Sequence, residues 1–178
     1  TSDILTEFLL IASIHLVAVI SPGPDFAVVL RQSLSSTRKS SIYTALGIAT
    51  SEFIHCLYSI FGMELIMKYQ ENVFLVLKPI AILYLFYLGI SSFFTNRPSE
   101  KLTQSSSKNF SLGFMTNLLN FQASTFTVTL FFAIVNINTP LSILIFYAIF
   151  IAVSTFVWFA FLSLLLTSKG FLYKFNNF

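Results

Sequence analysis

The clearest candidate site in the sequence is a short cluster that interrupts an apolar run and reads Ser21, Pro22, Gly23, Pro24, Asp25. Proline has no backbone N–H and its ring clashes with the preceding helical turn, so this pair of prolines predicts a broken helix. The glycine between them is expected to let the chain turn sharply. In lipid, the carbonyls freed by such a break need another partner, so the break is expected to face an internal cavity.

A break of this kind could bind a zwitterion. Freed carbonyls and the Asp25 carboxylate suit a cation, whereas N–H groups at the start of the resumed helix suit an anion. Ser21 or Gly23 is the expected N-cap of that helix, with Asp25 in its first turn. The alternative is a structural kink, or a helix that ends where the first loop begins, in which Asp25 serves only as a cap. The double proline together with Asp25 favours the functional break.

A second polar pair lies in the next apolar run. Glu52 and His55 are one helical turn apart, so they share a helix face and can meet. A carboxylate beside an imidazole that titrates near neutrality could carry a coupling proton. The alternative is a polar helix contact, in which a neutral Glu52 bonds a hydroxyl such as Ser51 or Thr50. No metal site with His15 is predicted, because nothing in the spacing enforces its geometry.

A third set of polar residues lies in the fourth apolar run. Asn117, Asn120 and Ser124 follow a helical spacing. They are therefore expected to form one stripe that faces the bundle interior, since amides in lipid would be left unpaired. One interpretation is hydrogen bonding between helices. The other is that Asn120 and Gln122 face Asp25 across a substrate path.

The composition defines the class of protein that must position these residues. Of 178 residues, 56% are hydrophobic and 10% are charged, whereas about a quarter of the residues in a soluble domain are charged. Repeated apolar runs reach the length of ~20 residues that crosses a bilayer as a helix. The sequence therefore predicts an all-α, polytopic membrane helix bundle and excludes an ordinary soluble enzyme or a nucleic-acid binder. The single cysteine, Cys56, excludes an internal disulfide and is expected to be a packing residue.

One membrane domain over residues 1–178 is expected, with about five transmembrane helices and a broken first helix. The expected spans are 4–30, 42–63, 73–94, 110–135 and 141–166, with a flexible cytoplasmic linker at 95–109. Most basic residues fall at one set of helix ends, which places the N-terminus outside and the C-terminus in the cytoplasm. These residues are Arg31, Arg38, Lys39, Arg97, Lys101, Lys108, Lys169 and Lys174, while Lys68 and Lys78 lie at or near the other ends.

The first segment has a competing interpretation as a cleaved signal peptide. It lacks the basic start of such a peptide and has Asp3 and Glu7 instead, which favours a mature helix.

Several motifs resemble the LysE/RhtB family of bacterial amino-acid exporters. They are SPGPDF at 21–26, ALGIAT at 45–50 with His55 beyond it, YLG at 87–89 and FSLGFMTNLLN at 110–120. The resemblance covers most of the chain, and its first motif is fairly specific because SPGP followed by Asp or Asn is unusual inside an apolar run. It implies a multi-helix inner-membrane permease that exports amino acids or their derivatives, coupled to the proton motive force.

Two departures from the family bear on this expectation. Where the family typically has Asn-Pro-Lys-Ala, this chain has Asn120, Phe121, Gln122 and Ala123, which removes a helix breaker and a cation. Family members usually have six spans, whereas five are expected here. The alternative is therefore a truncated, non-transporting remnant of an exporter, or a partner subunit that completes another chain.

The resulting hypothesis is a secondary-active exporter rather than an enzyme. Asp25, with the carbonyls freed near the prolines, would bind the ammonium group, N–H groups near Gly23 would favour the carboxylate, and Glu52 with His55 would carry the proton. The sequence has no phosphate loop, no Gly-x-Ser-x-Gly elbow and no His-Glu-x-x-His motif. No cofactor or metal is expected. The expected partners are a small amino-acid substrate and the lipid bilayer. The sequence is also compatible with a homo-oligomer. The predicted substrate-binding residues are Ser21, Pro22, Gly23, Pro24, Asp25, Asn117, Asn120 and Gln122.

Overall fold

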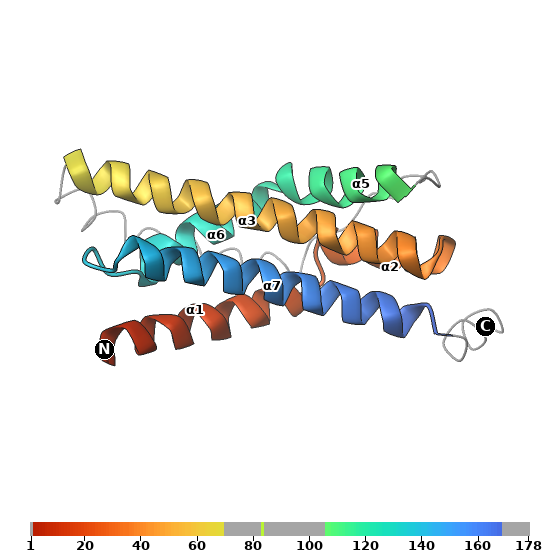
Figure 1. The fold of residues 1–178 in the computed structure, drawn as a ribbon, viewed down its shortest axis with the longest axis horizontal. Coiled ribbons are helices and arrows are strands. Elements are labelled where there is room, and N and C mark those ends of the chain that lie inside the picture. Colours follow the sequence, from red (N-terminus) through yellow and green to blue (C-terminus); the bar gives the residue numbers. More distant parts are fainter. Residues whose placement is uncertain (1, 70–82, 84–105, 169–178) are drawn as a thin grey trace.

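The computed structural model describes residues 2–69, 83 and 106–168, and within these ranges the chain is helical with no strand. Figure 1 shows the helices lying side by side in one elongated bundle. Their bounds are α1 Ser2–Ile20, α2 Pro24–Ser35, α3 Arg38–Tyr69, α5 Ser106–Leu118, α6 Phe121–Ile134 and α7 Leu141–Leu166. The expected all-α helix bundle is confirmed. The expected span 73–94 and residues 95–105 of the expected linker lie outside the described residues, while residues 106–109 begin α5.

The first helix is broken where the two prolines lie. α1 ends at Ile20 and α2 begins at Pro24, a first helical position where the missing N–H of proline does no harm. The N-cap of α2 is Gly23, with φ −128° and ψ −176°. This is extended backbone that any residue adopts, so the turn does not depend on the conformational freedom of glycine. The prolines alone account for the break.

A second break separates α5 from α6. Asn120 is the N-cap of α6, and its side-chain oxygen accepts hydrogen bonds from the backbone N–H groups of Gln122 and Ala123. The capping amide satisfies two of the N–H groups that a helix start leaves unpaired. The expectation that losing the family's proline removes the helix breaker here is therefore wrong, because the Asn120 cap starts a new helix without it.

Helix α3 packs against α2, α5, α6 and α7, and its contact with α5 is the tightest because glycines lie on both sides. A Cβ added at Gly47 would lie 2.1 Å from the carbonyl oxygen of Phe110, and one added at Gly113 would lie 2.0 Å from that of Thr44. Small residues allow two membrane helices to bring their backbones together. The spacing of α3 and α5 is thus set by these two glycines.

Two apolar clusters fill the two halves of the bundle. One is built mainly from α1, α3, α6 and α7 and includes Ile11, Cys56 and Phe131; the other joins α2, α3 and α7 and includes Val29 and Phe159. Cys56 is fully buried, which confirms its expected packing role. The polar residues of the candidate site lie between these clusters.

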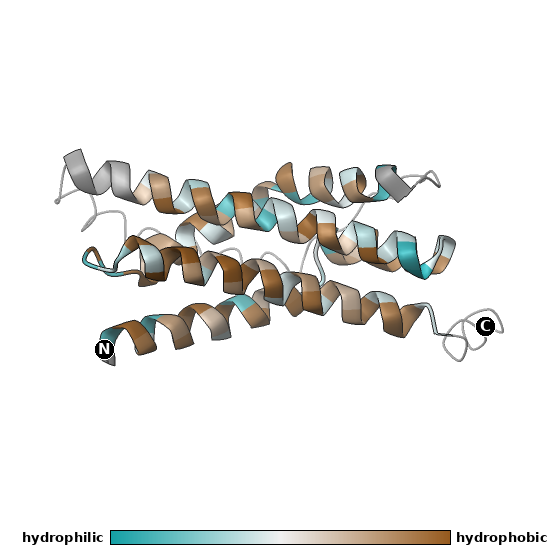
Figure 2. Cartoon of the chain, viewed as in Figure 1, coloured by the Kyte–Doolittle hydropathy of each residue, from teal (hydrophilic) through white to brown (hydrophobic). Residues whose placement is uncertain are grey.

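Figure 2 shows that α1 and α7 are apolar along most of their length. Among the described residues, three helical segments are long and apolar enough to cross a membrane: Asp3–Ile20, Arg38–Met63 and Leu141–Leu166. The apolar side chains that point outward, such as Val17 and Val157, suit contact with acyl chains.

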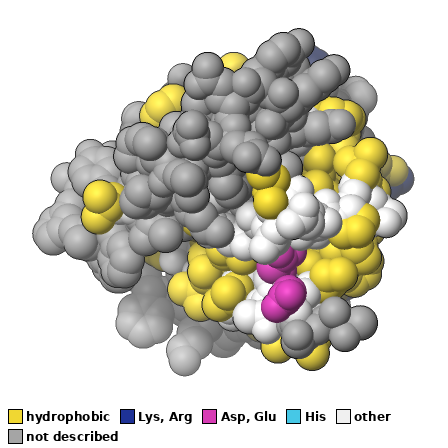
Figure 3. Space-filling model, turned by 90° about the vertical axis from the view of Figure 1, so that its left-hand side faces the viewer, with side chains coloured by type: hydrophobic (Ala, Val, Ile, Leu, Met, Phe, Trp, Pro, Cys, Tyr) yellow, Lys and Arg dark blue, Asp and Glu magenta, His cyan; other side chains and the backbone are white. Residues whose placement is uncertain are grey.

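The two ends of the bundle differ in charge. The described basic side chains lie toward the end where α2 finishes and α3 and α5 begin; they are Arg31, Arg38, Lys39 and Lys108. Asp3 and Glu7 lie at the start of α1, at the opposite end. Figure 3 views the molecule from this second end and shows acidic side chains at the surface among hydrophobic ones.

Candidate functional site

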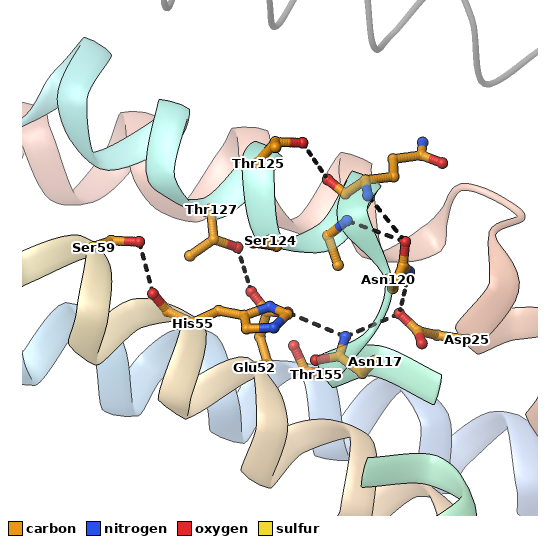
Figure 4. A network of polar contacts seen from close by, with 12 residues as sticks. Asp25, Glu52, His55, Ser59, Asn117, Asn120, Ser124, Thr125, Thr127 and Thr155 are labelled. Atoms are coloured by element: carbon orange, nitrogen blue, oxygen red, sulfur yellow. Dashed lines mark hydrogen bonds and ion pairs between the residues drawn. The ribbon is translucent and has the colours of Figure 1, made fainter. Parts of the chain in front are cut away.

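The candidate site lies where the two helix breaks meet (Figure 4). Asp25, in the first turn of α2, accepts hydrogen bonds at Oδ2 from Asn117 Nδ2 at 3.0 Å and from Asn120 Nδ2 at 3.4 Å. Asn117 lies in the last turn of α5, and Asn120 caps α6. The other oxygen of Asp25, Oδ1, is buried and has no hydrogen-bond partner in the described part of the chain.

Asn117 also joins Asp25 to a second carboxylate. Its Nδ2 lies 3.3 Å from Glu52 Oε2 on α3, so one amide nitrogen donates to both acids. The residue is only 1% exposed. Its amide oxygen is buried without a hydrogen-bond partner among residues 2–69, 83 and 106–168.

Glu52 is buried and receives two further contacts. Thr127 on α6 donates its hydroxyl to Oε1 at 2.5 Å, and His55 Nδ1 lies 3.7 Å from Oε2. The spacing of Glu52 and His55 thus brings them together as predicted. The hydroxyl partner of Glu52 is neither Thr50, which donates to the carbonyl of Leu46, nor Ser51, whose hydroxyl has no partner in the described ranges.

His15 extends the polar cluster to α1 and α7. It is buried, its Nε2 lies 3.3 Å from Thr155 Oγ1, and it interacts electrostatically with Glu52. The described helices contain no group of three or more His, Cys, Asp or Glu side chains placed to hold a metal ion. Every described helix therefore contributes a residue to one polar layer.

A pair of hydroxyls lies beside this layer. Tyr58 OH and Ser124 Oγ are 2.5 Å apart, and the Tyr58 ring lies 5.4 Å from the ring of His55. Tyr58 is 39% exposed, so the pair borders the buried cluster rather than belonging to its interior. The stripe expected from Asn117, Asn120 and Ser124 does face other helices, although the chain breaks within it.

The remaining predicted site residues lie at the edge of the cluster. Ser21 closes α1, because its hydroxyl donates to the carbonyl of Val17 at 3.0 Å and its N–H to that of Ala18 at 3.1 Å. Ser21 is therefore not the N-cap of α2, and the carbonyl of Ala18, four residues before Pro22, has a local partner instead of being freed by the break. Pro22 and Pro24 are exposed and Gly23 is half-buried.

Gln122 is half-buried in the first turn of α6 and donates its backbone N–H to the Asn120 cap.

Sequence reasoning missed Thr127, Thr155 and His15 as members of this cluster. A signal for Thr127 exists, since it follows Ser124 by three residues and extends the stripe by one turn. Thr155 and His15 lie on apolar helices, and only the packing of α1 against α7 brings them together.

This arrangement offers acceptors that suit a cation and N–H groups that suit an anion. Asp25 Oδ1 and Asn117 Oδ1 are acceptors for an ammonium group. The N-terminus of α2 has no side-chain cap, so its first N–H groups and its helix dipole suit a carboxylate. No hydroxyl in the cluster is paired with an imidazole and a carboxylate in the manner of a catalytic nucleophile, within the described residues.

Comparison with known proteins gives several related membrane proteins. The chain is 29% identical over 166 residues to the threonine efflux protein of Escherichia coli K12, covering 87% of this chain and 79% of that protein. It is 29% identical over 158 residues to the uncharacterized membrane protein YrhP of Bacillus subtilis, covering 81% and 75%. The membrane protein YahN of Escherichia coli K12 is 24% identical over 169 residues, covering 92% and 76%. No solved structure matches the chain significantly.

Residues 16–173 match the family described as LysE type translocator. This range includes both helix breaks and every residue of the polar cluster except His15. The resemblance seen in the motifs is thereby confirmed over most of the chain. The chain belongs to the LysE type translocator family and is a multi-pass membrane protein.

Proposed function

We propose that this protein is a secondary-active exporter of small amino acids or their derivatives in a bacterial inner membrane. The observation that carries the proposal is the buried Asp25 carboxylate, held between two broken helices with one oxygen that has no partner in the described ranges. The relatives named threonine efflux proteins make threonine the first substrate to test.

The ammonium group of the substrate binds Asp25 Oδ1 with the help of the Asn117 amide oxygen. Its carboxylate lies at the N-terminus of α2, where Gly23 and Pro24 begin the helix and leave its first N–H groups without a side-chain cap. Ser21 and Pro22 shape the break on one side, and Asn120 and Gln122 form the start of α6 on the other. Alternating access follows from rocking of the half-helices about this fixed layer.

Glu52 and His55 carry the coupling proton in this proposal. The support is their contact at 3.7 Å and their place between the two apolar clusters, away from the ends of the bundle. An ionisable group at this depth is costly unless it is paired, and such groups usually serve proton or ion pathways.

The basic end of the bundle faces the cytoplasm. Arg31, Arg38, Lys39 and Lys108 all lie toward that end, and cytoplasmic loops carry an excess of Lys and Arg. The N-terminus of α1, at the opposite end, is then outside.

Efflux from intact cells tests this function. Cells that express the chain are loaded with threonine-containing dipeptides and with a panel of other dipeptides, and amino acids appearing in the medium are followed. Faster threonine efflux than in cells with the empty vector supports the proposal, provided that Asp25→Asn and Glu52→Gln abolish the gain at equal protein level. Efflux no faster than the empty vector for every amino acid of the panel contradicts it.

A further inference from the structure

We infer that Asn117 is the positioning residue that couples substrate binding at Asp25 to proton release from the Asp25–Glu52 pair. This inference rests on the proposed export function and adds a residue role to it. The Asn117 amide nitrogen lies 3.0 Å from Asp25 Oδ2 and 3.3 Å from Glu52 Oε2. An amide nitrogen has two N–H groups, and both are used here.

Two carboxylates joined by one amide inside an apolar frame do not both ionise readily, because like charges at close range repel each other. In this inference the pair shares one proton before the substrate binds. Asn117 is the one described residue that hydrogen-bonds both acids, so it fixes the distance over which each acid responds to the charge of the other. Its burial leaves the interaction little screened by water.

The titratable groups that face the pair come from several elements. They are His15 on α1, His55, Cys56 and Tyr58 on α3, and the acids themselves on α2 and α3. From α5 and α6 the pair meets the neutral side chains of Asn117 and Thr127 instead, while Thr155 on α7 contacts His15. His55 is the nearest proton acceptor, and neither of its ring nitrogens has a hydrogen-bond partner in the part of the chain described.

Substrate binding then displaces the proton. The ammonium brings one positive charge to Asp25. This charge reduces the repulsion between the two carboxylates in place of the proton, so both acids can then be ionised. The O–H bond of the carboxyl breaks, an N–H bond forms on the His55 ring, and the proton then leaves to water. One cation enters and one proton leaves, which is the exchange that an export step driven by protons requires.

Proton release per bound threonine, measured in detergent with a pH indicator in weak buffer, tests this role. In the unaltered chain we expect about one proton per threonine at saturation. In Asn117→Leu, which has a similar volume but neither the N–H donors nor the amide oxygen offered to the ammonium group, we expect threonine to bind more weakly and, at saturating threonine, the released protons per bound threonine to fall by about tenfold. Asn109→Leu is the matched control, since Asn109 is another fully buried amide on α5 that bonds Gln32, away from the pair.

If Asn117→Leu does not fold, a second variant tests the same role. Asn117→Ser is smaller and retains one hydroxyl donor, which serves one carboxylate at a time, so it also loses the released proton while binding threonine. Unchanged proton release in either variant overturns the inference. So does loss of threonine binding in both variants with binding retained in Asn109→Leu, because Asn117 is then a binding residue only. An unaltered chain that binds no threonine or other amino acid instead contradicts the proposed function, which separates the two failures.

Discussion

Asn117 Nδ2 donates a hydrogen bond to Asp25 Oδ2 at 3.0 Å, and this contact joins the end of one half-helix to the start of another. The two residues are 92 positions apart in the sequence. Each lies beside a helix break, one made by prolines and one by a capping asparagine. The two breaks therefore form a single polar layer across the middle of the bundle.

The close approach of α3 and α5 predicts that neither glycine at their contact tolerates a methyl group. Gly47→Ala and Gly113→Ala each place a Cβ about 2 Å from a backbone oxygen, and overpacking of this kind costs about 1–3 kcal/mol or more. We expect the free energy of unfolding in detergent to fall by that amount. Gly62→Ala is the control on the same helix, because no described atom lies within 4 Å of its added Cβ. Equal stability of all three variants would show that α3 and α5 are not in contact as described.

The N-terminus of α2 predicts that one substitution weakens transport while stability changes little. A Cβ at Gly23 meets its nearest neighbour at 3.9 Å, so Gly23→Ser fits, and its hydroxyl can cap the helix. The cap changes stability by a few tenths of a kcal/mol at most. It also competes with the substrate carboxylate for the same N–H groups, so KM should rise severalfold, as expected for one hydrogen bond worth about 0.5–1.5 kcal/mol.

Thermal unfolding and threonine uptake by vesicles measure the two quantities for Gly23→Ser. A KM that stays at the value of the unaltered chain, together with unchanged unfolding, would remove the carboxylate from the N-terminus of α2.

Removing the hydroxyl of Thr127 is expected to lower the free energy of unfolding. Thr127→Val keeps the shape of the side chain and leaves the buried Glu52 oxygen without its donor at 2.5 Å, which costs about 1.5–3 kcal/mol for a charged acceptor. Thr129→Val is the matched control, because this buried hydroxyl on the same helix donates only to the carbonyl of Thr125. Chemical unfolding compares the two variants. A loss no larger in Thr127→Val than in Thr129→Val would mean that Thr127 does not stabilise Glu52.

Outside the candidate site, the contacts of Glu7 are expected to hold α1 against the rest of the bundle. Its buried carboxylate accepts hydrogen bonds from the Asn136 N–H at 2.8 Å, from the Thr139 hydroxyl at 2.9 Å and from the Tyr147 hydroxyl at 3.3 Å. Glu7→Gln turns an N–H group toward these donors and should destabilise the docking of α1 by about 1.5–3 kcal/mol.

Hydrogen exchange of residues 2–20 measures the docking of α1. We expect faster exchange there in Glu7→Gln and no change in Asp3→Asn, whose side chain is exposed. Identical exchange in the two variants would show that the Glu7 contacts do not hold α1.

The first break and the Glu52–His55 contact could be predicted from the sequence because their causes are local. A proline removes an N–H wherever it stands, and a spacing of three residues puts two side chains on one helix face. The second break could not be inferred from the absence of proline, because a single capping amide at Asn120 is sufficient to start α6. Gly23 was expected to let the chain turn sharply, but the backbone there is extended, a conformation that any residue adopts.

The contacts that close the site could not be read from the sequence, because they depend on which helices become neighbours. Thr127 meets Glu52 across 75 positions, and Thr155 meets His15 across 140. Periodicity gives the inward face of each helix but not the partner of that face. The two glycines that set the α3–α5 contact lie within the family-like motifs, yet their role emerges only from the distance between the backbones.

Threonine counterflow in vesicles, compared between the unaltered chain and Asp25→Asn, tests the central claim most directly. Counterflow needs no proton gradient, so it reports the substrate site alone. The asparagine keeps the shape of the side chain and removes the negative charge, so we expect apparent affinity for threonine to weaken by about 2–5 kcal/mol, with Asp3→Asn unchanged. Counterflow of Asp25→Asn at the rate and affinity of the unaltered chain would contradict the claim that the cargo's ammonium group binds between the two broken helices.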